Sequence, residues 1–407
     1  LKAFSVAARL YRLGWAGTYR LGLSTLKYFL ERDKLRGKAL FINFASRVKP
    51  LENTKKYFDD PRQMLGGIII ILKVPSGNER GVLLLKYSYY FLLFLEFYDV
   101  ARIQERYNII LEPSWAGFCD ETIMAYTQLP EPVFVQVYER RDRRLIDALD
   151  VNLIPLDVGP SWFVDHEVFS PPLPSEKRDI DIIMVASWST FKRHDAVFEV
   201  LSVLRERKPD LSIALVGYPG DLTKDDIAQM ASRRGLTMGL SFYEWITPSE
   251  VAQLLKRARV NVLWSKFEGN NRAIIEGMFC DTPCVLRRGH NYGEHYDYIN
   301  EKTGFFCDES DLAEKIAYIF EHPEAFSPRS YVMTARNCEI ATERMSSVIR
   351  AHEQAAGRPW CSDLLIKVNE LHGMRYWHAQ EPDNVQAACR GLAQHIKPHW
   401  QKEASVC

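Results

Sequence analysis

The amino-acid sequence predicts an α/β protein with two domains, each built on a parallel β-sheet covered by helices. Its 407 residues exceed one ordinary compact domain of about 150 residues. From Asp179 onward, short apolar runs alternate with amphipathic stretches, which is typical of strands and helices in such a sheet. An earlier block of the same kind begins with the uninterrupted apolar run 67–72.

The second block has the more regular pattern. Its apolar runs predict strands at 181–187, 212–217, 241–243, 260–265, 284–286 and 304–306. Amphipathic spacing between those runs predicts helices at 195–207, 224–234, 248–257, 272–279 and 312–320.

The first block is predicted less fully. After the turn-rich loop 75–81 we expect a long apolar helix, followed by strands at 108–111, 133–137 and 153–156. The proline-rich segment 170–174 cannot continue a sheet and predicts the linker between domains. Beyond Pro328 the chain is polar and helical with no further strand pattern, and it could return to brace the first domain. The predicted boundaries are therefore 1–60, 61–169, 170–327 and 328–407.

Composition excludes several classes of protein. With 26% charged residues and 52 basic against 52 acidic side chains, the chain is neither disordered nor collagenous, and a nucleic-acid partner is not expected. The eight cysteines form no C-x-x-C pair, so we expect cytosolic thiols and no metal site. Cys280 and Cys284 flank a turn, which explains them better than a metal does.

The segment 1–49 is strongly basic, with only Glu31 and Asp33 as acids. Its interleaved apolar residues are typical of interfacial helices on an anionic membrane surface, and ordinary helices packed on the first domain are the alternative. No secretory signal is evident, and no stretch reaches the roughly 20 apolar residues of a membrane span. We therefore expect a cytoplasmic protein, with peripheral contact to the inner membrane face left open.

The most informative loop follows the predicted strand 260–265. Ligands bind outside the carboxyl ends of strands in open parallel sheets. This loop leads into a helix and places Glu268 and Glu276 eight positions apart. Glu268 would lie beyond a bound phosphate, and Glu276 could accept hydrogen bonds from a ribose. The alternative is that Glu268 is a solvated loop acid and Glu276 a helix-surface residue.

The start of that helix predicts an anion site. Asn270 or Asn271 can cap the helix, which leaves the amides near Asn271, Arg272 and Ala273 free to meet an anion at the positive end of the helix dipole. A phosphate group fits this description.

This unit resembles the E-x7-E signature of retaining family-4 (group 1) glycosyltransferases, which have the GT-B fold of two Rossmann-like domains facing a central cleft. Other segments are similar to motifs of the same family. They are the lobe-junction motif at 164–171, the V-G-x-G turn at 216–220, the E-A-M and P-V-V run at 276–285, the T-G-x-L segment at 303–305 and the G-x-E-R loop at 77–82. The resemblance covers residues 66–320, and it is strong in the second domain and thin in the first.

The resemblance implies a nucleotide-diphosphate sugar donor held by the second domain and a glycan or lipid-linked acceptor presented by the first. It implies transfer of a hexose with retention and without a metal. Lys192 matches a family lysine that contacts the diphosphate, although a solvated lysine is the alternative. Arg193 takes the place of a family glycine, and Gly217 lies in the V-G-x-G turn that contacts the donor. The usual family arginine is replaced by Ser187, and Arg193 or Arg272 could substitute for it.

The resemblance further implies that Glu268 contacts hydroxyls of the donor sugar. A retaining outcome fits a front-face substitution or a covalent intermediate. The family histidine of the first domain is missing, and Glu139, at the end of a predicted strand, is the candidate that stands nearby. Two other functions remain open, a GT-B nucleotide-sugar epimerase and a non-catalytic glycan-binding or scaffold protein.

Overall fold

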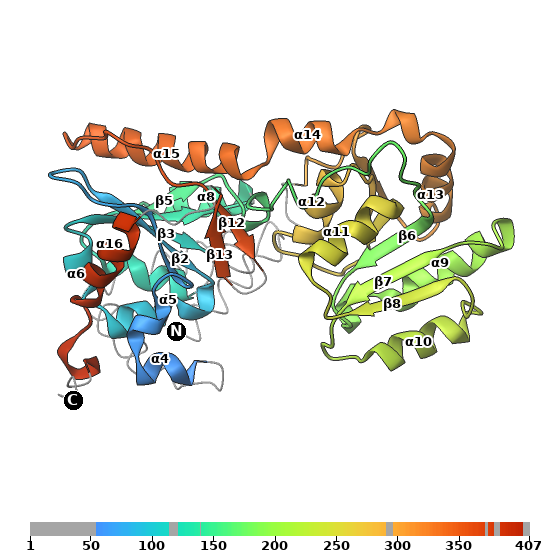
Figure 1. Ribbon diagram of the computed structural model, residues 1–407, viewed down its shortest axis with the longest axis horizontal. Helices are drawn as coiled ribbons and strands as arrows, with labels where there is room; N and C mark the ends of the chain where they lie inside the picture. Colours follow the sequence, from blue (N-terminus) through green and yellow to red (C-terminus); the bar gives the residue numbers. More distant parts are fainter. Residues whose placement is uncertain are drawn as a thin grey trace. The chain divides into compact units, whose positions relative to one another are not determined.

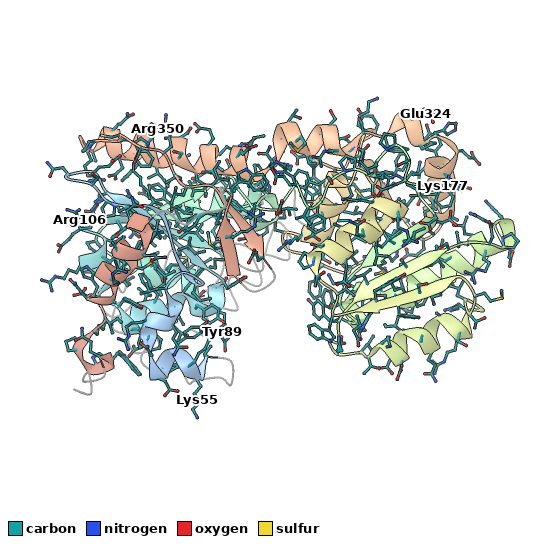
Figure 2. The ribbon with its side chains drawn as sticks, in the orientation of Figure 1. Lys55, Tyr89, Arg106, Lys177, Glu324 and Arg350 are labelled. Atoms are coloured by element: carbon teal, nitrogen blue, oxygen red, sulfur yellow. The ribbon has the colours of Figure 1, made fainter. Side chains whose placement is uncertain are left out.

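The computed structural model describes residues 54–113, 121–138, 140–289, 296–370, 373–377 and 383–401. The basic segment 1–49 and Glu139 lie outside these ranges. The described chain forms two compact units, one from the residues up to Pro160 together with those from Ala341 onward, and one from Ser161 to Ile340. The proline-rich segment 170–174 therefore lies inside the second unit, and the C-terminal part belongs to the first unit. Charged side chains such as Arg106 and Lys177 are exposed on their respective units (Figure 2).

The first unit contains a five-stranded sheet of order β1-β2-β3-β4-β5. Strands β2 to β5 are parallel, and β1 pairs antiparallel with β2 at the edge. The strands are β1 (Ile69–Lys73), β2 (Gly81–Lys86), β3 (Tyr107–Glu112), β4 (Val133–Gln136) and β5 (Leu153–Leu156).

The prediction of a long apolar helix directly after loop 75–81 is wrong in the position of that helix. The run Gly81–Lys86 is strand β2, and helix α5 (Ser88–Phe97) follows it. All six residues of β2 are buried, and β2 has a paired strand on each side. An apolar run of this length fits a buried strand and a buried helix equally well, so the pattern alone could not distinguish them.

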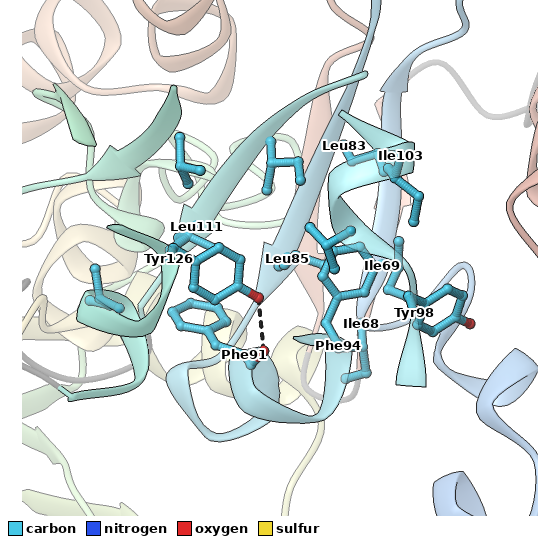
Figure 3. Close-up of a cluster of buried hydrophobic side chains, with 14 of the residues drawn as sticks. Ile68, Ile69, Leu83, Leu85, Phe91, Phe94, Tyr98, Ile103, Leu111 and Tyr126 are labelled. Carbon is cyan, nitrogen blue, oxygen red and sulfur yellow. Dashed lines mark hydrogen bonds between the residues drawn. The ribbon is translucent and has the colours of Figure 1, made fainter. Parts of the chain in front are cut away.

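One face of this sheet packs on a core built from alternate strand residues. Leu83, Leu85 and Leu111 point to the same side as Phe91 and Phe94 of α5 (Figure 3). The hydroxyl of Tyr126 donates to the backbone carbonyl of Phe91 at 2.8 Å. The other helical segments before Pro160 are α4 (Lys55–Asp59), η1 (Pro61–Met64), α6 (Val100–Ile103), α7 (Glu121–Met124), η2 (Ala125–Gln128) and α8 (Arg140–Leu149).

The C-terminal part contains two strands, which corrects the prediction of no strand beyond Pro328. Helix α15 (Cys338–Ala355) leads to the antiparallel hairpin β12 (Lys367–Glu370) and β13 (Gly373–Tyr376), and then to α16 (Asp383–Ala393) and η6 (Pro398–Trp400). The Lys367 ammonium is buried and lies 2.7 Å from the Glu112 carboxylate at the end of β3. The hairpin is therefore held partly by a buried polar contact, which a search for apolar runs cannot detect.

The second unit contains a six-stranded, fully parallel sheet of order β11-β10-β9-β6-β7-β8. Its strands β6, β7 and β8 lie side by side in Figure 1. The predicted alternation of strands and helices is confirmed. The strands are β6 (Ile180–Val185), β7 (Ile213–Gly217), β8 (Leu240–Glu244), β9 (Ala258–Leu263), β10 (Cys284–Arg287) and β11 (Gly304–Cys307).

Helices cover both faces of this sheet. One core packs α9 (His194–Arg207), α10 (Lys224–Arg233) and α13 (Leu312–Glu321) against one face. A second core packs α11 (Pro248–Arg257), α12 (Arg272–Phe279) and α14 (Pro328–Ala335) against the other. The short turns η3 (Pro160–Trp162), η4 (Thr190–Lys192) and η5 (Pro323–Ala325) complete the described elements. No helix of the described residues has both the length and the apolar character needed to cross a membrane.

Candidate functional site

Two loops at the carboxyl edge of the second sheet bring the predicted catalytic pair together. Lys192 ends η4, after β6, and Glu268 lies in the loop after β9. Because β6 and β9 are neighbouring strands, the two loops leave the sheet side by side. The Lys192 Nζ lies 2.5 Å from the Glu268 Oε1, and the two side chains are only 10% and 9% exposed. Neither residue is therefore a solvated surface group.

A serine that the sequence did not single out completes this pair. The Ser265 hydroxyl donates to the same Glu268 Oε1 at 2.5 Å, and Ser265 is fully buried. Two donors on one carboxylate oxygen fix the direction of the carboxylate, because each restricts its rotation. The signal that could have identified Ser265 is its place just after the end of β9, where ligand-side residues gather.

The start of α12 has the geometry of an anion site. The Asn271 side chain caps the helix by accepting from the Ile274 amide at 3.1 Å. Asn270 instead accepts from the Ser161 amide at 2.5 Å, so Asn271 is the capping residue of the two. The amides of the first helical turn, including those of Arg272 and Ala273, have no carbonyl partner within the helix itself.

A tyrosine from a distant loop holds the turn before α12. The Tyr296 hydroxyl donates to the Gly269 carbonyl at 2.9 Å and accepts from the Asn271 amide at 3.3 Å. Burial raises the pKa of Tyr296 well above its usual value, so the hydroxyl keeps its proton. Sequence reasoning missed this residue, because nothing in the local pattern links it to a turn 25 to 27 positions away.

Glu276 lies one turn into α12 and is buried rather than exposed on the helix surface. The Arg272 Nε donates to its Oε1 at 2.6 Å. The helix packs so closely on β9 that a Cβ on Gly277 would lie 2.6 Å from the side-chain amide nitrogen of Asn261. The Asn261 side chain also donates to the Ala273 carbonyl at 3.0 Å. This close contact fixes the start of α12 beside the end of β9.

The Arg193 side chain pairs with a different acid from the one that Lys192 contacts. Its guanidinium forms an ion pair with Glu309 at 2.8 Å, and the Trp264 indole donates to the same carboxylate at 3.2 Å. The Arg193 backbone has φ of +57°, a left-handed conformation that favours glycine. The structure thus explains why glycine suits this position, and Arg193 adopts the same backbone at some cost in strain.

Gly217 ends β7 at a point of close approach. A Cβ there would lie 2.2 Å from the Ala186 carbonyl oxygen and 3.0 Å from the Trp188 ring, so only glycine fits. The residue thereby lets the loops after β6 and β7 pack together. Its predicted contact with a donor stays a prediction.

One buried histidine beside the pair is unsuited to proton transfer. Burial, and to a smaller extent the charge of Lys192, lowers the pKa of His194 to about 3, so it is neutral around pH 7.

Across the described ranges, no three His, Cys, Asp or Glu side chains are grouped as a metal site requires. The arrangement can therefore offer cations, helix amides and oriented carboxylates to a ligand that carries a phosphate and hydroxyls.

Comparison with known proteins matches part of this chain to a protein family. Residues 165–335 match the family model described as glycosyl transferases group 1. The resemblance that the motifs predict is therefore confirmed for this segment, which includes all the described site residues. The finer assignment to retaining family 4 stays a prediction.

Two curated relatives match part of the chain. The Bacillus subtilis (strain 168) protein named as glycosyltransferase EpsD is 25% identical over 178 residues, covering 40% of this chain and 44% of that protein. Mannosylfructose-phosphate synthase of Agrobacterium fabrum is 25% identical over 157 residues, covering 36% of this chain and 34% of that protein. The chain thus spans less than half the length of these relatives.

Solved structures show the same fold. Sucrose-phosphate synthase from Thermosynechococcus elongatus matches with a TM-score of 0.51 at 17% identity, covering 67% of this chain and 74% of that chain. TarM matches with a TM-score of 0.50 at 17% identity, covering 68% of this chain and 55% of that chain. At such low identity the likeness is one of fold alone, and it confirms the predicted GT-B fold.

Proposed function

We propose that this protein is a glycosyltransferase that moves a hexose from a nucleotide-diphosphate sugar to a glycan or lipid-linked acceptor, with retention and without a metal. The observation that carries the proposal is the buried Lys192–Glu268 pair, which lies in the segment that matches group 1 glycosyltransferases. Glu276 and the capped start of α12 lie in the same segment.

The proposed chemistry assigns one role to each group. Lys192 and the first amides of α12 stabilise the negative charge that grows on the departing diphosphate. Glu276 accepts from the ribose hydroxyls, and Glu268 accepts from hydroxyls of the donor sugar. Because Glu268 also holds Lys192, one carboxylate links the sugar contact to the phosphate contact.

In the transfer step, the acceptor hydroxyl oxygen bonds to the anomeric carbon while the bond from that carbon to the diphosphate oxygen breaks. The proton of the acceptor hydroxyl passes to the departing phosphate oxygen on the same face of the sugar. This front-face route needs no separate protein base. A catalytic role for Glu139, which lies outside the described residues, stays a prediction.

A thermal-shift screen with UDP, GDP, ADP and their hexose conjugates tests the proposal. A ligand that binds only the native state stabilises it, by about 2.7 kcal/mol at a concentration one hundred times Kd. The melting temperature rises as a result. We expect a shift with one nucleotide and its sugar, and release of that nucleoside diphosphate when an acceptor extract is added. No shift with any nucleotide would favour the non-catalytic scaffold instead.

The predicted membrane contact of residues 1–49 is a separate proposal, and it needs its own test. Liposome sedimentation should recover the protein in the pellet with vesicles containing anionic lipid and in the supernatant with neutral vesicles. Equal recovery in both supernatants would remove the membrane contact.

A further inference from the structure

The two loops that carry Lys192 and Glu268 are joined by an uncharged contact. The rings of Phe191 and Phe267 lie face to face, with centroids 4.8 Å apart and planes 9° from parallel. Each phenylalanine immediately precedes one member of the ion pair. The stack therefore lies one residue away from the groups that the proposed transfer uses.

Further contacts connect the same two loops. The Lys266 amide donates to the Phe191 carbonyl at 2.8 Å. The Lys192 ammonium lies 4.9 Å from the centroid of the Phe191 ring, within the range of a cation–π contact. Phe191 thus contacts the loop of Glu268 through its ring and its backbone, and it also limits where the Lys192 side chain can point.

Burial in a core does not explain the stack. Among the described residues, neither ring belongs to the two hydrophobic cores of the second unit, and Phe267 is 39% exposed. The stack joins the loops after β6 and β9 at the edge where the proposed donor binds.

Under the proposed function, the ion pair becomes a weaker link between the two loops when a donor binds. A diphosphate competes for the Lys192 ammonium, so the hold of Glu268 on that lysine weakens as the ligand binds. An aromatic stack has no net charge, and neither phosphate nor salt competes for it. Together with the backbone hydrogen bond from Lys266 to Phe191, such a contact can keep the two loops at one separation whether or not a donor is bound.

We propose that Phe191 and Phe267 are positioning residues that clamp the Lys192 loop to the Glu268 loop. The inference rests on the proposed function, since it deepens the account of the same site. The clamp acts on catalysis through the positions of Lys192 and Glu268, and small displacements of such groups can slow a reaction by up to about a hundredfold.

Steady-state kinetics of three variants test the clamp. Phe267→Ala removes the stack, Phe267→Tyr keeps the ring, and Tyr318→Ala is a control that removes an exposed aromatic of α13 in the same unit. We expect Phe267→Ala to lower kcat at least tenfold, on the scale of geometric misplacement. The kcat of Phe267→Tyr should stay within about threefold of the wild-type value, and the kcat of Tyr318→Ala should equal the wild-type value. Wild-type kcat in Phe267→Ala, or equal losses in the Ala and Tyr variants, would overturn the clamp.

Hydrogen–deuterium exchange without any ligand keeps the inference distinct from the proposed function. The clamp predicts faster amide exchange in both 187–193 and 264–271 for Phe267→Ala, and unchanged exchange there for Tyr318→Ala. Faster exchange only in 264–271 would contradict a link between the loops. If the wild type transfers no sugar, the proposed function fails while this exchange result still decides whether the clamp exists.

Discussion

Replacing Tyr296 with phenylalanine removes one oxygen atom from beneath the start of α12. The ring is buried and lies 4.9 Å from the Tyr298 ring, so the substitution keeps the packing. It deletes the donor to the Gly269 carbonyl and the acceptor of the Asn271 amide. Leaving such buried backbone groups without this partner costs about 1–3 kcal/mol.

The cost should appear in both stability and donor binding. For a unit of this size, each kcal/mol lowers the melting temperature by about 2–4 °C. The loosened turn leads directly into the first amides of α12, which we propose hold the diphosphate. We therefore expect the donor KM to rise by about tenfold, since 1.4 kcal/mol lost from binding corresponds to that factor, while kcat changes less.

Differential scanning fluorimetry and initial rates over a range of donor concentrations measure the two effects. Tyr331→Phe, which removes a hydroxyl from α14 in the same unit, is the matched control and should change neither. A lower melting temperature with an unaltered KM would show that the hydroxyl supports only the fold. An unaltered melting temperature and KM would refute the reasoning altogether.

Three further predictions concern ionisable groups. Glu268→Ala should mainly slow transfer, with kcat falling by a larger factor than the donor KM rises, as initial rates over a range of donor concentrations can show. Lys192→Met should destabilise the protein by about 3–5 kcal/mol in urea unfolding because it leaves a buried carboxylate unpaired, and adding Glu268→Gln should restore stability without restoring activity. Burial would raise the pKa of Glu79, but hydrogen bonds from Lys73 and two backbone amides outweigh it and lower that pKa below its usual 4.5. The Glu79 contribution to stability is thus present above about pH 4.5 and is lost as the pH falls, so the deficit of Glu79→Gln should shrink in acid unfolding curves.

The second unit was well predicted because its local signals agree with its fold. Helix α11 begins and ends where the sequence predicts, since Thr247 and Glu250 form a capping box and Pro248 suits the first turn. The proximity of Lys192 and Glu268, 76 positions apart, follows from one rule about the carboxyl ends of parallel strands.

The parts that sequence reasoning missed depend on tertiary contacts. Strand β2 is an apolar run whose strand character comes from its neighbours, and β12 is anchored partly by the buried contact of Lys367 with Glu112. Ser265 and Tyr296 act through hydrogen bonds whose partners no periodic pattern reveals. The sequence predicts Arg193 at the phosphate site, whereas its ion pair with Glu309 depends on the position of the loop after β11.

We propose above all that the carboxyl edge of the second sheet binds a nucleotide-diphosphate sugar. Isothermal titration calorimetry with UDP, GDP and ADP, on the wild type and on Glu276→Ala, tests it most directly. We predict saturable one-to-one binding of one nucleotide to the wild type, and binding to Glu276→Ala that is weaker by about tenfold, the equivalent of a lost hydrogen bond to a charged group. Binding of none of the three to the wild type, or equal affinity in the variant, would contradict the claim.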